Sequence, residues 1–407
     1  MIDCPVSKKC GSCAYSRTDY ATQLEDKRRA VEEAFAGAGL KVKVNPVAGM
    51  EEPRFYRNKI ISYVTERAGR TVCGMYEENT HNLIPSPRCP LHDKVLDSLL
   101  HDITDYLNAL KIKSFGHGGV LKNILLRIGV KTGQVMVVFV TSEDMFHGRA
   151  ELVRRITSAH REVRTIVQNI NPRQTSVVLG DRQRVLLGPG FIHDVLLGAK
   201  FKISPRSFYQ INPCQTARLY SKALELADIR PGDNILDAYC GIGTIGICAV
   251  LKSEGCLLTG VEINRDAVRD AKVNAAENGL QRARFICGDA VRFLLDTDER
   301  VDVLFVDPPR SGCDEAFLRA IERLRPSRIV YISCNPLTQA RDIASLKGRY
   351  IVREVWPFDM FPHTAHIENV LVAVPSATAQ PTRPRGEVDY LRKQKKTAAM
   401  MHPKAAK

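Results

Sequence analysis

Apolar and polar stretches alternate along the second half of the chain, and they predict strands and helices in turn. Apolar runs with the composition of buried strands lie at 235–236, 257–261, 303–306, 329–332 and 370–374. Between them, apolar residues recur at helical spacing. Asn264 and Gly279 delimit one such helix, and Asp314 and Pro326 delimit another. This alternation predicts a doubly wound parallel sheet of the α/β class.

Shorter alternating runs fill residues 42–203 and predict a separate, mixed α+β domain. Strands are expected at 57–64, 71–75, 121–130, 134–141, 164–170, 176–179, 184–187 and 200–203. The turn Lys131–Gly133 predicts a hairpin, and a helix is expected at about 92–110. An amphipathic helix is expected from about Ala14 to Ala36, ended by Gly37 and Gly39.

Length and charge narrow the class of protein. A chain of 407 residues exceeds one ordinary domain, so two or three are expected. No apolar run reaches 18 residues and the N-terminus lacks an apolar signal core, so we expect a cytoplasmic protein that does not enter the membrane. The net charge of +14 predicts a polyanionic partner. Residues 376–407 carry eight basic and two acidic residues without periodicity and are expected to form a disordered tail, and the rest of the chain is basic without them.

A glycine-rich turn follows the strand at 235–236. Asp237 ends the apolar run, and Gly241, Gly243 and Gly246 form G-x-G-x-x-G before a helix, where a ligand can approach the backbone. Glu262 ends the next strand, where its carboxylate can accept the hydroxyls of a ribose. NAD and S-adenosylmethionine both carry such a ribose, so this pattern fits either cofactor.

Two further strand ends favour methyl transfer. Asp307-Pro308-Pro309-Arg310 follows one strand and Ser333-Cys334-Asn335-Pro336 follows another. Because the carboxyl ends of parallel strands share one edge, Glu262, Asp307 and Cys334 are expected at one crevice. A hydride-transfer site has no use for this cysteine.

Methylation at carbon 5 of a pyrimidine, by contrast, needs a thiolate that adds to carbon 6 and a base that later removes the carbon 5 proton. A second titratable cluster, which ends in Glu368, lies in the segment before the last strand.

Cysteines near the N-terminus predict a metal site. Cys4, Cys10 and Cys13 are spaced C-x5-C-x2-C, and Cys89 lies in a similar loop-like setting. Twelve cysteines in a cytoplasmic protein indicate thiols, metal or catalysis rather than disulfides. The spacing allows a tetrahedral zinc or a four-iron cluster and argues against a radical S-adenosylmethionine enzyme.

Residues 42–203 combine cationic and planar side chains, which suit single-stranded or looped RNA. These residues are Arg54, Phe55, Tyr56, Arg57, Lys59, Phe115, Lys122, Arg127, Lys131, Arg173, Arg182 and Arg184.

Together, these motifs resemble the RNA 5-methyluridine methyltransferase family over roughly residues 1–375. The resemblance is carried by Asp-Ala-Tyr-Cys-Gly-Ile-Gly-Thr-Ile-Gly, Asp307-Pro308-Pro309-Arg310, Ser333-Cys334-Asn335-Pro336 and Phe361-Pro362-His363-Thr364-Ala365-His366-Ile367-Glu368. Within the family the chain is similar to RumA-like 23S ribosomal RNA enzymes, because its four cysteines look like their [4Fe-4S] ligands.

The resemblance implies a Rossmann-like, class I S-adenosylmethionine-dependent methyltransferase domain and a role for each site residue. Cys334 would be the nucleophile and Glu368 the base. The cofactor would be contacted by Gln210, Tyr239, Gly241, Gly243, Glu262 and Asp307. A [4Fe-4S] cluster would be held by Cys4, Cys10, Cys13 and Cys89. RNA, most simply 23S ribosomal RNA, would be the partner, and no obligate protein partner is evident.

On this reading the chain divides into five parts. They are a cluster-binding segment (1–13), a helix packing on the methyltransferase domain (14–41), an RNA-binding central domain (42–203), the methyltransferase domain (204–375) and the basic tail (376–407). Many relatives begin with a small β-barrel, the TRAM domain, whereas this chain starts at the cysteines. RNA specificity is therefore expected from residues 42–203.

Three rival functions remain open. A transfer RNA enzyme could methylate the T-loop uridine by the same chemistry. An exocyclic-amine methyltransferase would need no Cys334 and would favour an aromatic residue where Arg310 stands. A non-catalytic iron–sulfur RNA-binding protein would have no use for Glu262, Asp307, Cys334 and Glu368.

Overall fold

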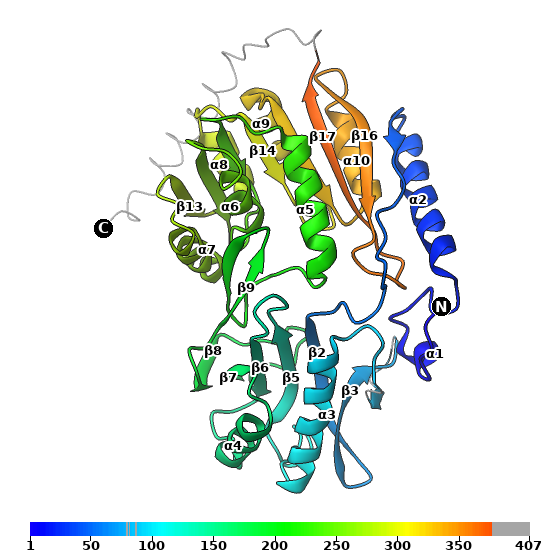
Figure 1. The fold of residues 1–407 in the computed structure, drawn as a ribbon, viewed down its shortest axis with the longest axis vertical. Helices are drawn as coiled ribbons and strands as arrows, with labels where there is room; N and C mark the ends of the chain where they lie inside the picture. The colour runs from blue at the N-terminus through cyan, green and yellow to red at the C-terminus, as the bar shows by residue number, and fades with distance from the viewer. Residues whose placement is uncertain (79, 81, 86–87, 377–407) are drawn as a thin grey trace, which may run out of the picture.

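The computed structural model describes residues 1–78, 80, 82–85 and 88–376, which form two large sheets joined by a shared core (Figure 1). The expected basic tail lies outside the described residues from position 377 on. Within the described part, no helix combines the length and apolar character needed to cross a membrane.

The upper sheet in Figure 1 has eight strands in the order β1-β16-β17-β15-β14-β11-β12-β13. They are β1 (Lys43–Val44), β11 (Asn234–Asp237), β12 (Leu257–Glu262), β13 (Ala283–Cys287), β14 (Val303–Val306), β15 (Arg328–Ser333), β16 (Tyr350–Phe358) and β17 (Glu368–Pro375). The expected α/β sheet is confirmed, but it is mixed rather than parallel throughout, because β17 runs antiparallel to both β15 and β16.

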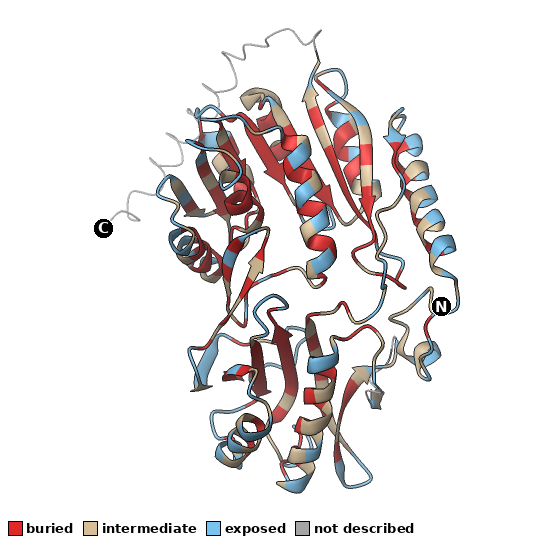
Figure 2. Cartoon of the chain, viewed as in Figure 1, coloured by how far each residue is buried: buried red, intermediate tan, exposed pale blue. Residues whose placement is uncertain are grey.

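Helices cover both faces of this sheet, which explains why its strands read as continuous apolar runs. One face packs against α5 (Pro213–Ala227), α6 (Thr244–Val250) and α7 (Arg265–Glu277). The other packs against α2 (Tyr20–Gly37), α8 (Ala290–Asp296), α9 (Glu315–Leu324) and α10 (Pro336–Ser345). Figure 2 shows the buried residues concentrated in the strands and on the helix faces that meet them.

The helix boundaries follow local capping. Asn264 accepts hydrogen bonds from the backbone of Asp266 and Ala267, so it caps α7 as the sequence predicts. Asp314 caps α9 in the same way. The N-terminal helix expected from Ala14 begins only at Tyr20, because Asp19 accepts from the backbone N–H of Thr22 and starts the helix there.

The lower sheet has seven strands in the order β4-β3-β2-β5-β6-β7-β8. They are β2 (Lys59–Arg67), β3 (Arg70–Tyr76), β4 (Leu83–Pro85), β5 (Leu121–Ile128), β6 (Val135–Thr141), β7 (Val163–Ile170) and β8 (Arg182–Leu187). The helices α3 (Lys94–Ala109) and α4 (Arg149–Ala159) cover one face. The strand expected at 176–179 is wrong, because the side chain of Asn171 binds the carbonyls of Val177 and Val178 and keeps this segment a loop.

A hairpin of β9 (Ile192–Leu196) and β10 (Ala199–Ile203) lies between the two large sheets. The strand β6 is buried along its whole length, so its alternate residues serve two cores. Met136 and Val138 pack in one cluster with Phe201 of the hairpin and Leu219 of α5, while Phe139 packs towards α3 and α4. One continuous core therefore connects the lower sheet to the upper one, and the five-part division of the chain stays a prediction.

The turn after β11 has the backbone geometry that its glycines allow. Gly241 and Gly243 have φ of 54° and 83°, values that favour glycine. Asp237 is buried, and its Oδ2 accepts a hydrogen bond from the backbone N–H of Gly246 at 3.1 Å. Burial raises the pKa of Asp237 to about 7; the Gly246 bond lowers it, and the charges of Asp307 and Glu262 raise it.

We predict that the free energy of unfolding of Asp237→Asn increases relative to that of wild type as pH rises. The carboxyl of Asp237 titrates near 3.9 in an unfolded chain and near 7 in the folded protein. Its contribution to stability is therefore complete below about pH 4 and is lost as pH rises to about 7. Urea denaturation at pH 5 and pH 8 should show the variant gaining on the order of 2 kcal/mol over wild type between the two conditions. The exposed Asp298→Asn is the control, and an equal effect of Asp237→Asn at both pH values would contradict the assignment.

Candidate active site

Strand pairing brings Cys334 and Glu368 to the same edge of the upper sheet. Cys334 directly follows β15, and Glu368 is the first residue of β17. The two strands are antiparallel with Ser333 opposite Asn369. One further step of this register sets Cys334 against Glu368. Because β17 runs against its neighbours, its beginning meets the ends of β14 and β15 (Figure 1).

The charges around Cys334 form one coupled group. The pKa of the Cys334 thiol is raised to about 11, mainly by burial; the carboxyl groups of Glu368 and Asp307 also raise it, and the guanidinium of Arg310 lowers it. Burial also raises the pKa of Glu368 well above its usual range, with Asp307 adding to the shift and Arg310 opposing it. Each group acts on the others only because they lie close together. At neutral pH the resting site therefore holds Cys334 as a thiol.

The start of α10 favours the thiolate form. Cys334 precedes Asn335, whose side chain caps α10 by accepting from the backbone N–H of Leu337 at 3.1 Å, so the thiol lies at the positive end of a helix. Asn335 also donates to the carbonyl oxygen of Arg310 at 3.0 Å and so ties the turn after β14 to the turn after β15.

Arg310 supplies the positive charge of this group. Its Nη2 lies 3.3 Å from Nδ1 of His366, just upstream of Glu368. From the sequence, Arg310 belonged to a motif of the family resemblance and argued against an exocyclic-amine enzyme, but it was given no role in the site. Its place at a strand end, directly after Asp307-Pro308-Pro309, is the signal that could have marked it as a site residue.

The residues predicted to contact the cofactor surround the same edge. Glu262 ends β12, and its carboxylate accepts from the backbone N–H of Gly241 at 3.1 Å and of Asn264 at 2.7 Å. Asp307 follows β14, and burial raises its pKa to about 7. Tyr239 lies in the turn after β11 with its ring 5.5 Å from that of Phe317.

Gln210 comes from the connection between β10 and α5. Its carbonyl oxygen accepts from Asn58 Nδ2 at 3.1 Å, so the residue just before β2 contacts this connection. The places of these residues agree with the roles the resemblance implies, and the roles themselves stay predictions.

The four N-terminal cysteines line one cavity. Cys4, Cys10, Cys13 and Cys89 meet there together with Arg57 and His92, beside the short helix α1 (Ser7–Cys10). Four thiols are a suitable donor set for zinc or for a four-iron cluster. As placed, however, no group of three or more His, Cys, Asp or Glu side chains within the described ranges could hold a metal ion. The cluster is therefore not confirmed.

The basic residues predicted to follow RNA have different environments. Arg127 is 1% exposed and donates to the carbonyl oxygen of Ser207 at 2.8 Å, so it joins β5 to the connection between β10 and α5 and does not face a partner. For this residue the prediction is wrong. Lys122 lies in a groove on the lower sheet, with its Nζ 5.5 Å from the centre of the exposed Phe115 ring.

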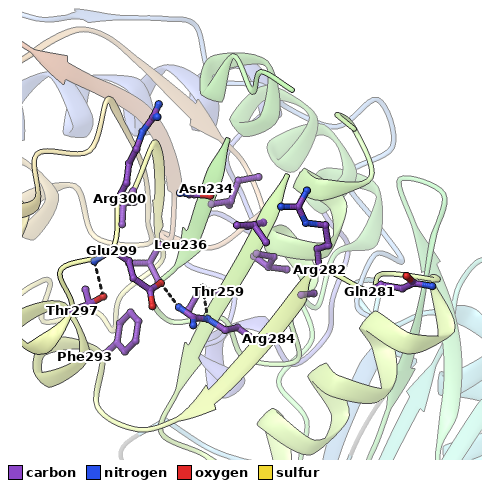
Figure 3. A pocket seen from close by; sticks show the side chains of 15 residues that line it. Asn234, Leu236, Thr259, Gln281, Arg282, Arg284, Phe293, Thr297, Glu299 and Arg300 are labelled. Carbon is purple, nitrogen blue, oxygen red and sulfur yellow. Dashed lines mark hydrogen bonds and ion pairs between the residues drawn. The ribbon is translucent and has the colours of Figure 1, made fainter. Parts of the chain in front are cut away.

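A separate pocket lies at the opposite edge of the upper sheet, near the starts of β11, β12 and β13 (Figure 3). None of the predicted site residues lines it. Arg284 donates to Thr259 and pairs with Glu299 within the pocket, and Arg300 pairs with Asp302. Its cations therefore already have partners, and the catalytic candidates lie elsewhere.

Comparisons with known proteins agree with this geometry. A family model described as tRNA (Uracil-5-)-methyltransferase matches residues 19–374. An uncharacterized RNA methyltransferase of Halalkalibacterium halodurans is 41% identical over 378 residues, which are 91% of this chain and 82% of that protein. One from Clostridium acetobutylicum is 37% identical over 380 residues, with the same shares.

A solved structure extends the similarity to three dimensions. The tRNA (uracil-54, C5)-methyltransferase of Pyrococcus abyssi, in complex with S-adenosyl-L-homocysteine, has a TM-score of 0.73 and 29% identity, covering 88% of this chain and 84% of that one. The resemblance carried by the sequence motifs is thereby confirmed at the level of the family. The chain belongs to the tRNA (uracil-5-)-methyltransferase family of S-adenosylmethionine-dependent RNA methyltransferases.

Proposed function

We propose that this protein methylates carbon 5 of a uracil in RNA through a transient bond between Cys334 and carbon 6. The observation that carries the proposal is the meeting of Cys334 and Glu368 at one sheet edge, with Arg310 as the neighbouring cation. When bound there, S-adenosylmethionine supplies an electrophilic methyl group.

Each protein group has one task in this reaction. Cys334 loses its proton to solvent and adds to carbon 6 as a thiolate. The displaced electron pair makes carbon 5 nucleophilic enough to bond the methyl carbon, whose bond to the sulfonium sulfur breaks as the sulfur keeps the electron pair of that bond. Glu368 then takes the proton from carbon 5, the carbon 5–carbon 6 double bond reforms, and the thiolate leaves. A raised pKa makes the Glu368 carboxylate a stronger base than an exposed one. Arg310 and the start of α10 stabilise the sulfur anion before it adds to carbon 6 and again when it leaves.

The cofactor would be held by the predicted residues at this edge. The carboxylate of Glu262 is fixed by two backbone N–H groups and keeps lone pairs for the ribose hydroxyls. The glycine backbone at 241 and 243 permits close approach. Tyr239, Asp307 and Gln210 would complete the contacts.

RNA would also contact the lower sheet. The groove there includes the paired rings of Tyr63 and Tyr76, with centroids 4.2 Å apart, as well as Phe115 and Lys122. Aromatic faces and an ammonium group suit unpaired bases and phosphates.

The adduct predicts a clear difference between two site variants. With RNA containing 5-fluorouridine, wild type should form a covalent complex visible on a denaturing gel. Carbon 5 then carries fluorine in place of the proton that the base removes, so the adduct cannot break down. Cys334→Ala should form none and lose turnover. Glu368→Gln should slow turnover by about 10²- to 10⁴-fold and accumulate adduct on ordinary uridine RNA. The exposed Cys214→Ala is the control. Full turnover by Cys334→Ala would eliminate the mechanism, and failure of wild type to methylate RNA would favour a non-catalytic role.

For the substrate we propose 23S ribosomal RNA, supported by the similarity of the four cysteines to those of RumA-like enzymes. Transfer RNA is the second candidate, favoured by the printed names of the family model and of the Pyrococcus abyssi protein.

Mass spectrometry of RNA from a deletion strain should show loss of 5-methyluridine from 23S fragments. Restoring the wild-type gene should return it, and the Cys334→Ala gene should not. Intact 23S modification with loss from transfer RNA would contradict the ribosomal assignment and support the alternative.

We also propose that Cys4, Cys10, Cys13 and Cys89 hold a [4Fe-4S] cluster. Their common cavity and the cationic Arg57 beside it support this donor set.

Protein purified without oxygen should contain about four iron and four sulfide per chain. Cys13→Ser and Cys89→Ser should each lower both values, and Cys214→Ser should not. Zinc without sulfide would contradict the assignment.

A further inference from the structure

Residues 359–367 form the loop that leads into Glu368, and a buried ion pair fixes this loop to the helix α2. Lys27 of α2 places its Nζ 2.6 Å from Oδ1 of Asp359, and the two side chains are 2% and 0% exposed. The hydroxyl of Tyr20 donates to the other carboxylate oxygen at 2.9 Å. Lys27 also donates to the carbonyl oxygen of Phe361 at 3.3 Å. One helix therefore binds both the side chain and the backbone of this loop.

Gln23 of the same helix holds a second point. Its Oε1 accepts from the backbone N–H of His363 at 3.1 Å. Its Nε2 lies 3.1 Å from Nδ1 of the same residue, and since an amide nitrogen only donates, this ring nitrogen accepts. His363 is buried with φ of 68°, a conformation unusual for a residue with a side chain. The surrounding bonds must maintain it, and Gln23 supplies two of them.

The remainder of the loop is bound from other elements. Asn212 donates to the carbonyl oxygen of Met360 at 3.0 Å, and Tyr56 donates to that of Pro362 at 3.0 Å. The end of this loop leads directly into the candidate site. His366 contacts Arg310, and Glu368 is the first residue of β17. The held loop therefore leads directly into Glu368, which strand pairing with Phe358 of β16 holds from the other side.

A buried ion pair is weak evidence for stability, because apolar residues of similar volume often serve as well. Lys27 and Gln23 instead make directional contacts with the loop. Together they form four hydrogen bonds to it. Such contacts define position rather than contribute packing.

We propose that Lys27 and Gln23 are positioning residues that hold Glu368 in place to remove the carbon 5 proton. This inference rests on the proposed function. It concerns one step, because Glu368 acts only after the methyl group has been transferred. A displaced Glu368 leaves thiolate addition and methyl transfer intact and slows release of the RNA. Loss of the loop contacts should therefore raise the fraction of enzyme covalently bound to methylated RNA.

The test uses Gln23→Met, which keeps the length of the side chain and removes its hydrogen bonds. The double variant Lys27→Met/Asp359→Leu removes the ion pair without leaving a buried charge. Val31→Ala is the matched control, because Val31 is buried on the same helix and packs in the core between α2 and the upper sheet. For each protein, kcat, the KM for S-adenosylmethionine, the melting temperature and the covalently bound fraction with ordinary uridine RNA are measured.

We expect both loop variants to lower kcat by about 10- to 100-fold, with KM within about twofold of wild type and a raised adduct fraction. Val31→Ala should lower the melting temperature and leave the adduct fraction unchanged. Wild-type kcat in both loop variants, or a fall in kcat without more adduct, overturns the inference while the proposed function stands. A wild-type enzyme that forms no adduct with 5-fluorouridine RNA overturns both.

Discussion

The strand β17 runs antiparallel to β15, and this direction brings Glu368 to the same edge of the sheet as Cys334. In a wholly parallel sheet the first residue of β17 would lie at the opposite edge, with the starts of β14 and β15. Here Glu368 begins the strand at the edge where β14 and β15 end, and pairing of Ser333 with Asn369 sets its distance from Cys334. The glycine turn, Glu262 and Asp307 reach this edge because the remaining strands are parallel. One reversed strand among parallel ones thus brings Glu368 to the same edge as the residues expected to contact the cofactor.

The pKa shifts at this edge of the upper sheet arise mainly because its side chains are buried. Burial raises the pKa values of Asp237, Asp307 and Glu368 together, and Arg310 opposes the shift at Glu368. The same burial disfavours the thiolate form of Cys334. The helix start at α10 and Arg310 favour the sulfur anion. At neutral pH the raised pKa of Cys334 therefore keeps it a thiol.

The sequence allowed prediction of those features that depend on local patterns. Apolar runs predicted β14 and β15, Asn264 and Asp314 marked helix starts, and strand-end polar residues identified the edge. The direction of β17 could not be predicted, because a buried strand has the same composition in either direction. The amphipathic pattern predicted the helix that carries Lys27 and Gln23 but not the burial of these two residues, since only distant partners such as Asp359 reveal it. Arg127 read as a partner-binding cation because nothing local shows that Ser207 covers it. The four cysteines were identified from spacing, which says nothing about the separation of their sulfur atoms.

The most direct test of the account is a crystal structure of the protein with S-adenosylhomocysteine and a short RNA carrying 5-fluorouridine at the target position. We predict continuous electron density from Cys334 Sγ to carbon 6 of the uracil, with the carboxyl of Glu368 facing carbon 5. A base bound in the crevice with Cys334 turned away from it and no covalent bond to the ring would contradict the account.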